Sequence, residues 1–409
     1  MVPAQAQEDR LAELERRLAE QQQRIEQLET ALAARAPAPD AAGSVTAVVP
    51  ATGQASAPLA PPALALKPET TPHIPGLDVG GDFRVRGEWN FGGPRGRSRS
   101  AVRARLRATY AVDRDFTLGA RLVTGDPDDP NSSDVTLGNF ADDFAVTLDQ
   151  AWIGYRHGRL SAYAGKFPQI FQRTDMLWDG DVSPQGVGAE YHLPIGKGAL
   201  DGRLLWFVID EAPVARDSDM LGGQLSFSAP LSSSVSISTS GSYYHYRLGS
   251  VAGADQGDFR GNLMAGGRYL SDFRILEWLG SIRWAAFGEK WPLTLSIDYA
   301  RNLGAAVPAD QAFNVDLSAG RASAPGDWRL AYNYSEVETD AVFTAFSHDN
   351  IDLASNYRLH GVGLSHIPAP NLQLDLLWYH FRQLDAVYAG PAASREWLDR
   401  IRLSHMVSF

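Results

Sequence analysis

Arginine residues recur at alternate positions in several short segments of this chain. Alternate residues of an extended strand share one face, so each segment is expected to present its guanidinium groups on a single side. In the segment 102–108 the intervening residues are apolar, which leaves the arginines facing away from the apolar side. The full set is Arg84, Arg86, Arg103, Arg105, Arg107, Arg121, Arg400 and Arg402. If these segments are neighbours in a sheet, their side chains form one basic wall.

Acidic residues that could oppose this wall lie in the segment 168–184, at Asp175, Asp179 and Asp181. If the segment folds inward, we expect its carboxylates to face the arginines across a narrow gap. Opposed rows of charge produce a transverse field that orients polar solutes and disfavours apolar ones. The alternative is that these charges simply solvate a water-filled interior.

A second acidic group, Asp126, Asp128, Asp129 and Asp134, has the clustered oxygens that Ca²⁺ prefers. It lacks the glycine and distal glutamate of an EF-hand, so an acidic surface loop is the favoured interpretation and Ca²⁺ the alternative. The nine histidines are scattered, and we find no metalloprotease, serine-hydrolase or phosphate-loop motif. We therefore predict no catalytic residue and no cofactor. A barrel enzyme using His245 or His360 remains an alternative.

Composition excludes several classes of protein. The chain has 409 residues and a formal net charge of -11, which argues against a nucleic-acid partner. It has no cysteine, which removes disulfides, thiol catalysis and cysteine-ligated zinc. No apolar run approaches the roughly 18 residues of a membrane helix. This criterion does not detect the strands of a transmembrane barrel, because their apolar and polar residues alternate.

From about Leu77 onward the chain alternates between apolar and polar residues. Segments such as 293–299, 313–317, 328–335 and 372–378 place aliphatic and aromatic side chains on one face and polar or charged ones on the other. A soluble sandwich also alternates, but its inner face is dry. Charges on the inner face of strand after strand are typical of a transmembrane barrel, with lipid outside and water inside. We predict an all-β transmembrane barrel over residues 77–409.

Connections between these strands alternate in length. Short turns fall at 113–115, 157–159, 194–198, 229–233, 288–290, 324–327 and 368–371, and longer segments lie between them. Seven short turns and eight long loops predict about 16 antiparallel strands, with 248–275 as a region that could hide another hairpin. An even count places both chain ends on the short-turn side, which is the periplasm in such barrels.

The chain ends on a strand pattern with apolar residues at 401, 403, 407 and 409. The terminal Phe409 resembles the signal that the outer-membrane assembly machinery reads. An ordinary strand that happens to end the chain is the alternative.

Three segments precede the barrel. Residues 1–7 are interpreted as the start of a mature exported chain with an added Met. Residues 8–36 predict a coiled coil, because apolar residues recur at heptad spacing; its seam is Leu11, Leu14, Leu18, Gln21, Ile25, Leu28 and Leu32. A lone amphipathic helix is the alternative. Residues 37–76 are rich in proline and alanine and predict a linker.

The stretches 148–155, 164–168, 176–181 and 185–187 resemble the strand, turn, strand and inward third loop of general porins. With the heptads, the chain resembles the bacterial outer-membrane putative porin family. That resemblance implies a homotrimer that forms a water-filled diffusive channel.

We therefore interpret the chain as an outer-membrane porin for passive diffusion of ions and small hydrophilic solutes. Its expected partners are two further copies, outer-membrane lipid and lipopolysaccharide, with the coiled coil in the periplasm. The alternative is a structural tether whose coiled coil reaches toward peptidoglycan.

Overall fold

The computed structural model describes residues 74–92, 96–138, 140–141, 143–251, 261–285, 287–389 and 396–409. The predicted coiled coil and nearly all of the predicted linker lie outside the described residues. Within those ranges, no helix is long and apolar enough to cross a membrane.

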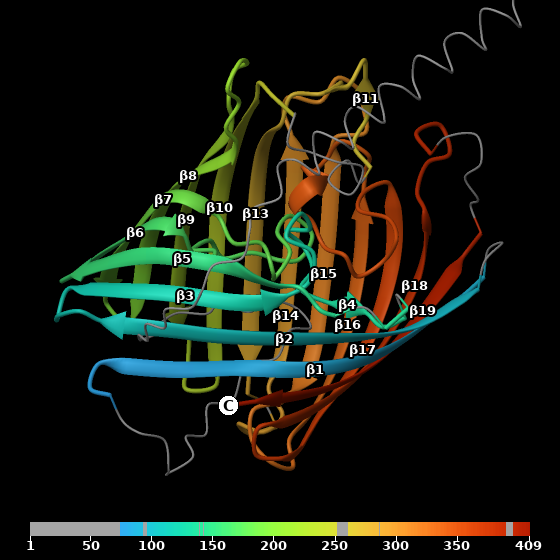
Figure 1. Cartoon of the computed structure of the whole chain (residues 1–409). Helices are drawn as coiled ribbons and strands as arrows, with labels where there is room; N and C mark the ends of the chain where they lie inside the picture. Colours follow the sequence, from blue (N-terminus) through green and yellow to red (C-terminus); the bar gives the residue numbers. More distant parts are fainter. Residues whose placement is uncertain are drawn as a thin grey trace, which may run out of the picture. The chain divides into compact units, whose positions relative to one another are not determined.

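The described chain is a succession of antiparallel strands around a wide barrel (Figure 1). The elements are β1 (Leu77–Phe91), β2 (Arg97–Ala111), β3 (Phe116–Thr124), β4 (Val135–Thr136), β5 (Val146–His157), β6 (Leu160–Lys166), β7 (Gln185–Ile195), β8 (Gly198–Asp210), β9 (Ser218–Pro230), β10 (Val235–Leu248), β11 (Met264–Ala265), β12 (Arg268–Tyr269), β13 (Arg274–Trp284), β14 (Leu293–Asn302), β15 (Gln311–Gly320), β16 (Trp328–Val337), the short helix η1 (Thr344–Phe346), β17 (Tyr357–Ala369), β18 (Leu372–Gln383) and β19 (Leu398–Ser408).

Each strand pairs with its neighbour in the chain, and β19 pairs with β1 to close the barrel. The described part of the main sheet has 17 strands, of which β4 is a two-residue addition inside a loop. The wall therefore has the 16 antiparallel strands that the sequence predicts. The region 248–275 does contain a hairpin, but its two-residue strands β11 and β12 form a separate small sheet.

All seven short turns and all eight long loops occur where the sequence predicts them. The turns after β5, β7 and β17 each leave two residues outside the strands, whereas 18 residues separate β6 from β7. The start of β1 and the end of β19 lie on the short-turn side. There the N–H of Phe409 donates to the carbonyl of Gly81, and the N–H of Gly81 donates to the carbonyl of Phe409, at 3.1 and 3.0 Å.

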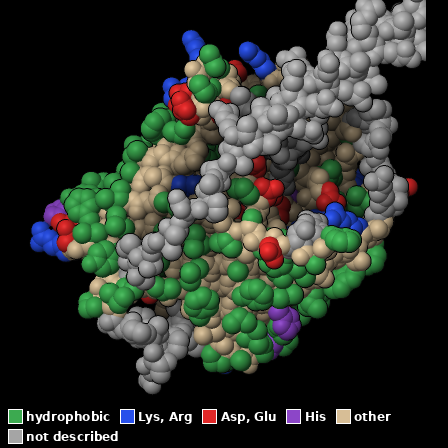
Figure 2. All heavy atoms as spheres, in the orientation of Figure 1, with side chains coloured by type: hydrophobic (Ala, Val, Ile, Leu, Met, Phe, Trp, Pro, Cys, Tyr) green, Lys and Arg blue, Asp and Glu red, His purple; other side chains and the backbone are tan. Residues whose placement is uncertain are grey.

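The outer face of the wall is apolar. Alternate residues of most strands are exposed aliphatic or aromatic side chains, among them Leu106, Leu225, Trp278 and Leu376, and Figure 2 shows hydrophobic side chains spread over the outside of the barrel. An arginine in that position would cost about 2–4 kcal/mol at the middle of a bilayer. This cost explains why arginines of the same strands occupy the inner face.

Two long loops fold into the barrel. We call residues 167–184, between β6 and β7, the third loop, and residues 338–356, between β16 and β17, the seventh loop. Both contribute to a buried apolar cluster inside the barrel, in which Trp178 of the third loop is fully buried. The interior is thus narrowed by packed loops rather than left fully open.

Candidate pore constriction

The predicted arginines come from four adjacent strands, β19, β1, β2 and β3. Register brings several of them side by side: Arg84 is the direct partner of Arg103, and Arg107 is the direct partner of Arg121. Arg400 and Arg402 approach from β19 and are almost completely buried. We keep the name basic wall for these eight residues.

Most of the wall is paired with carboxylates of its own strands. Asp82 of β1 accepts hydrogen bonds from Arg103 and Arg105, each at 2.8 Å. Glu88, also on β1 and 1% exposed, accepts from Arg402 at 2.7 Å and from Arg99 at 2.8 Å. Sequence reasoning did not include these two acids or Arg99, although Asp82 and Glu88 have the same parity as Arg84 and Arg86 along β1. That shared parity was the signal that could have found them.

A bulge supplies another partner. The pairing of β3 with β5 shifts between Arg121 and Leu122, so Leu148 stays exposed on the outside while Asp149 becomes the extra residue. Arg121 donates through Nε to Asp149 at 2.5 Å. An alternating strand alone would not have placed this carboxylate there.

The acidic segment 126–134 was predicted to be a surface loop, with Ca²⁺ binding as the alternative, and its last residue differs from both. Asp134 is buried against the basic wall, where it contacts Arg84 at 2.8 Å and Arg86 at 2.5 Å. Burial acts to raise the pKa of Asp134, but Arg84 and Arg86 outweigh it and hold the pKa below its ordinary value.

The other members of that segment cap their own turn: Asp126 and Asp129 accept from backbone N–H groups two residues on, and Asp128 lies between them. Across the described ranges, no three histidine or acidic side chains gather as metal ligands would. Asp134 is therefore not grouped with the other three acids in one cation site, because it forms ion pairs with Arg84 and Arg86 instead.

The third loop crosses the interior from one wall to another. Gly165 and Gly186, direct partners at its two ends, have φ angles of +111° and +147°. A Cβ at either would lie within 2.3 Å of a neighbouring carbonyl oxygen, so glycine is required at both. Thr174 donates to Asp298 of β14, and at the far end Arg121 and Gln150 donate to Ser183 at 3.2 and 2.9 Å.

Its three acidic residues have separate environments. Asp181 touches the basic wall directly, at 2.9 Å from Arg105 and 4.0 Å from Arg103. Asp175 lies 3.6 Å from Arg173 and accepts from Asn350 of the seventh loop at 3.4 Å. Asp179 is buried and accepts the backbone N–H of Asp181 at 2.8 Å. Of the three predicted carboxylates, only Asp181 reaches the wall, and it does so by contact rather than across a gap.

Because their environments differ, the carboxyl groups of Asp175, Asp179 and Asp181 have different pKa values. Burial raises the pKa of Asp175 to about 6, and burial with neighbouring Asp349 raises that of Asp179. Burial would also raise the pKa of Asp181, but Arg105 and Arg103 hold it below its ordinary value. Asp181 is therefore ionised wherever the protein is folded, whereas Asp175 changes charge near neutral pH.

The seventh loop completes the constriction and was not predicted. Its Phe346 stacks on Trp178 with ring centres 5.7 Å apart, and Asn262 fixes its backbone by donating to the carbonyl oxygens of Thr339 and Val342 at 3.0 and 2.9 Å. The signal was the apolar run 341–346 inside an otherwise polar loop. An apolar run of this kind is expected to pack against other apolar side chains, away from water.

A cavity lies where the two loops meet the opposite wall of the barrel. Most of its lining groups can donate or accept hydrogen bonds: Asp175, Met176, Asn314, Asn333, Ser335, His348, Asn350, Tyr357, Leu359 and Tyr379. Arg402, of the basic wall, lies with its guanidinium carbon 5.8 Å from the centre of the Tyr379 ring. The interior thus holds a small cavity between the two loops, with Arg402 of the basic wall beside one of its lining residues.

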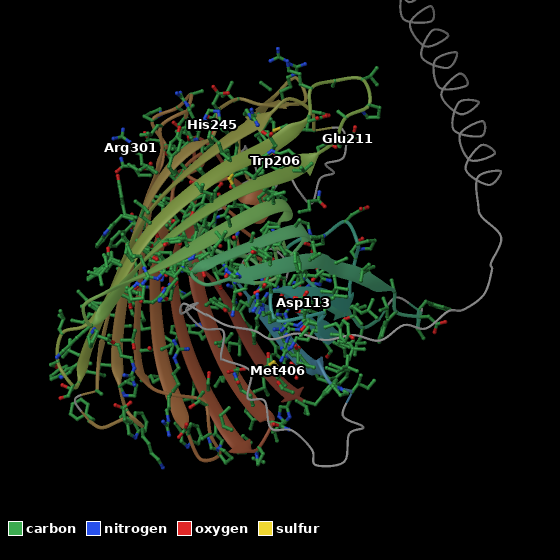
Figure 3. All side chains as sticks on the ribbon, turned by 90° about the vertical axis from the view of Figure 1, so that its left-hand side faces the viewer. Asp113, Trp206, Glu211, His245, Arg301 and Met406 are labelled. Atoms are coloured by element: carbon green, nitrogen blue, oxygen red, sulfur yellow. The ribbon has the colours of Figure 1, made fainter. Side chains whose placement is uncertain are left out.

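Other predicted residues lie apart from this constriction. His360 alternates with the buried Leu359 and therefore points to the outer face, where its Nδ1 lies 2.9 Å from the hydroxyl of Tyr332. His245 is opposite Arg274 at the loop end of β10, and Figure 3 shows it near the rim. Met406, also labelled in Figure 3, was not among the predicted residues, and its sulfur lies 3.7 Å from Arg103 of the basic wall.

A closed barrel of sixteen antiparallel strands, apolar outside and polar within, with a loop folded inward, defines the architecture of outer-membrane porins. Residues 93–257 match the model of the family described as Putative porin. The chain is an outer-membrane porin, a channel rather than an enzyme. The comparison with curated protein sequences finds no match.

Solved structures with the same fold include OprB of Pseudomonas putida and OmpF of Salmonella typhi. The OprB structure has a TM-score of 0.54 at 12% identity, over 82% of this chain and 94% of that one. The OmpF structure has a TM-score of 0.50 at 12% identity, over 81% of this chain and 97% of that one. At these identities the likeness concerns the fold.

Proposed function

We propose that ions and small hydrophilic solutes diffuse passively through this porin, past the constriction formed by the basic wall and the two inward loops. The observation that carries the proposal is the polar cavity between those loops and the facing strands. Its lining combines amide, hydroxyl and carboxylate groups, which can replace the water that a small solute gives up on entry.

Purified protein in a planar bilayer tests this. Stepwise current increments that scale with bulk salt concentration are expected for a diffusive channel. Absence of conductance from protein with a folded, heat-modifiable barrel would instead favour the structural tether. The coiled coil on which the tether depends lies outside the described residues.

We further propose that the barrel assembles as a homotrimer. Outward positions on β2, β3 and β5 carry a continuous row of small side chains, because Ala108 is the partner of Ala120 and Ala120 is the partner of Ala151. Lys166 is the partner of Ala151 and extends the row onto β6. A small-residue surface allows close van der Waals approach of another wall, and an outward lysine suits a subunit contact better than lipid.

Large outward side chains lie elsewhere on the same strands, as with Leu122 and Leu148, and also on β8, β9 and β13. These side chains suit acyl chains. The alanine row and the outward Lys166 support an assembly in which β2–β6 face a neighbouring copy, and chemical cross-linking through Lys166 in native membranes tests it.

A further inference from the structure

Two arginines stand directly opposite each other on the outer face of the barrel. Arg358, the second residue of β17, is the cross-strand partner of Arg382, the last but one of β18. Both alternate with buried inward residues, Leu359 and Phe381, so their side chains leave the wall on the outside. The pair lies at the end of the barrel that carries the long loops. Like charges directly opposite in a sheet are destabilising.

Of these two arginines, only Arg358 has a carboxylate partner among the described residues. Arg358 donates to Glu336 of β16 at 2.5 Å. In the parts of the chain that the structure describes, no carboxylate lies within 4.0 Å of Arg382, and its Nε is buried without a hydrogen-bond partner. Two other outward arginines near the same rim are each matched: Arg247 with Asp219 at 2.6 Å, and Arg301 with Asp310 at 2.9 Å.

Aromatic rings hold the unmatched guanidinium in place. The carbon of the Arg382 guanidinium lies 4.8 Å from the centre of the Trp397 ring. His380 stacks on the same ring at 4.3 Å and is itself fixed by Asp399 at 2.9 Å. Asp399 also accepts from the indole of Trp378 at 2.8 Å. Tryptophan and histidine rings of this kind suit the boundary between acyl chains and headgroups.

We propose that Arg358 and Arg382 together bind a phosphate group of a phosphorylated lipid in the outer leaflet. Two adjacent guanidiniums offer parallel N–H donors that match phosphate oxygens, and an anion between them removes the like-charge repulsion. The outward direction of both side chains favours a membrane lipid over a phosphate dissolved in the channel. The diffusion of solutes does not require this site.

Binding to the full-length porin in detergent tests the proposal. The probes are lipid A carrying its phosphates, the same lipid A with the phosphates removed, and inorganic phosphate. The variants are Arg358→Gln with Arg382→Gln, Arg382→Gln alone, and the matched control Arg301→Gln at the same rim (Figure 3). Bilayer conductance and heat-modifiable migration report folding of each variant.

The double variant is expected to lose about tenfold or more in affinity for phosphorylated lipid A, since charge-assisted hydrogen bonds are removed. Arg382→Gln alone leaves the Arg358–Glu336 pair intact, so it should fold and give most of the loss. Arg301→Gln should bind as the wild type does. Dephosphorylated lipid A should bind weakly and equally to all four proteins.

Equal affinity of wild type and Arg382→Gln for phosphorylated lipid A would overturn the proposal. So would inorganic phosphate that displaces the lipid at comparable concentration, because the site would then recognise free phosphate. These outcomes are separate from channel function, which the conductance measurement reports independently.

Discussion

At the scale of single residues, the interior is governed by how each charge is compensated. The basic wall is not a row of free cations: Arg103 and Arg105 share Asp82, and Arg105 also holds Asp181 of the third loop. The arginines therefore position the loop as well as charge the passage. A change in the wall has both an electrostatic and a steric consequence.

Replacing Arg103, Arg105 and Arg107 together with serine is predicted to shift the reversal potential toward cation preference and to raise conductance. The substitution removes three positive charges from the lumen wall, and three long side chains leave the lumen. Reversal potentials in a salt gradient provide the measurement. Arg114→Ser, in an exposed turn, is the control that should change nothing, and an unchanged potential in the triple variant would contradict the prediction.

Asp175 is predicted to make ion preference depend on pH. Burial raises its pKa to about 6, so it is neutral below that pH and negative above it. Cation preference should therefore fall as the pH drops through about 6. The effect on the stability of the folded protein has the opposite sign to that of a carboxylate in an ion pair. The neutral form of Asp175 stabilises the packed loop, and this stabilisation is lost as the pH rises through about 6.

Asp175→Asn should show the low-pH behaviour throughout. Asp113→Asn is a suitable control, because Asp113 lies in an exposed turn where backbone N–H groups lower its pKa. A titration of ion preference near pH 6 that survives in Asp175→Asn would assign the effect to another group.

At the scale of elements, the strands were predictable, the inward third loop was predicted from the resemblance to general porins, and the inward seventh loop was not predicted. Strand alternation is a local signal, since lipid and water impose opposite demands on successive residues, and the turn pattern then fixes the strand count. The seventh loop depends on contacts between distant segments, such as Asn262 with Thr339. The pairing of Asp134 with Arg84 and Arg86 is likewise set by the tertiary fold, so the sequence alone favoured an acidic surface loop, with a Ca²⁺ site as the alternative.

The third and seventh loops are predicted to act as one packed unit held by Trp178. This ring is fully buried and contacts Tyr244 as well as Phe346. Trp178→Ala removes about 3–5 kcal/mol of packing, which should loosen the loops while the hydrogen-bonded wall persists. Single-channel records are expected to show higher and noisier conductance. Trp206→Ala, on the outer face (Figure 3), should leave the records unchanged.

The last strand is predicted to matter for insertion rather than for conduction. Phe409 pairs with Gly81 at the short-turn end and is half exposed on the outside, away from the inward loops. Deleting it should lower the amount of porin in the outer membrane of cells, while protein refolded in detergent conducts normally. If the variant that lacks Phe409 reaches the outer membrane in normal amounts, Phe409 has no role in assembly.

At the scale of the whole molecule, the barrel is stabilised by its own closed network of hydrogen bonds. Its strands form a closed ring, so the backbone groups of the wall are satisfied without an exposed sheet edge. Segments 1–73 are then free to serve another purpose, and the heptads of 8–36 predict that the purpose is association. In the trimer that we propose, the alanine row on β2, β3 and β5 is the contact surface of the barrel itself.

The coiled coil is predicted to support the trimer without creating it. Leu18→Asp with Ile25→Asp places charges in the seam without partners, which should unfold the stalk. The barrel should remain folded and conducting, and its trimers on semi-native gels should dissociate at a lower temperature. Leu18→Ile with Ile25→Leu keeps the seam apolar and serves as the control. Monomers alone would make the stalk the trimerisation element; an unshifted dissociation temperature would remove residues 8–36 from the assembly altogether.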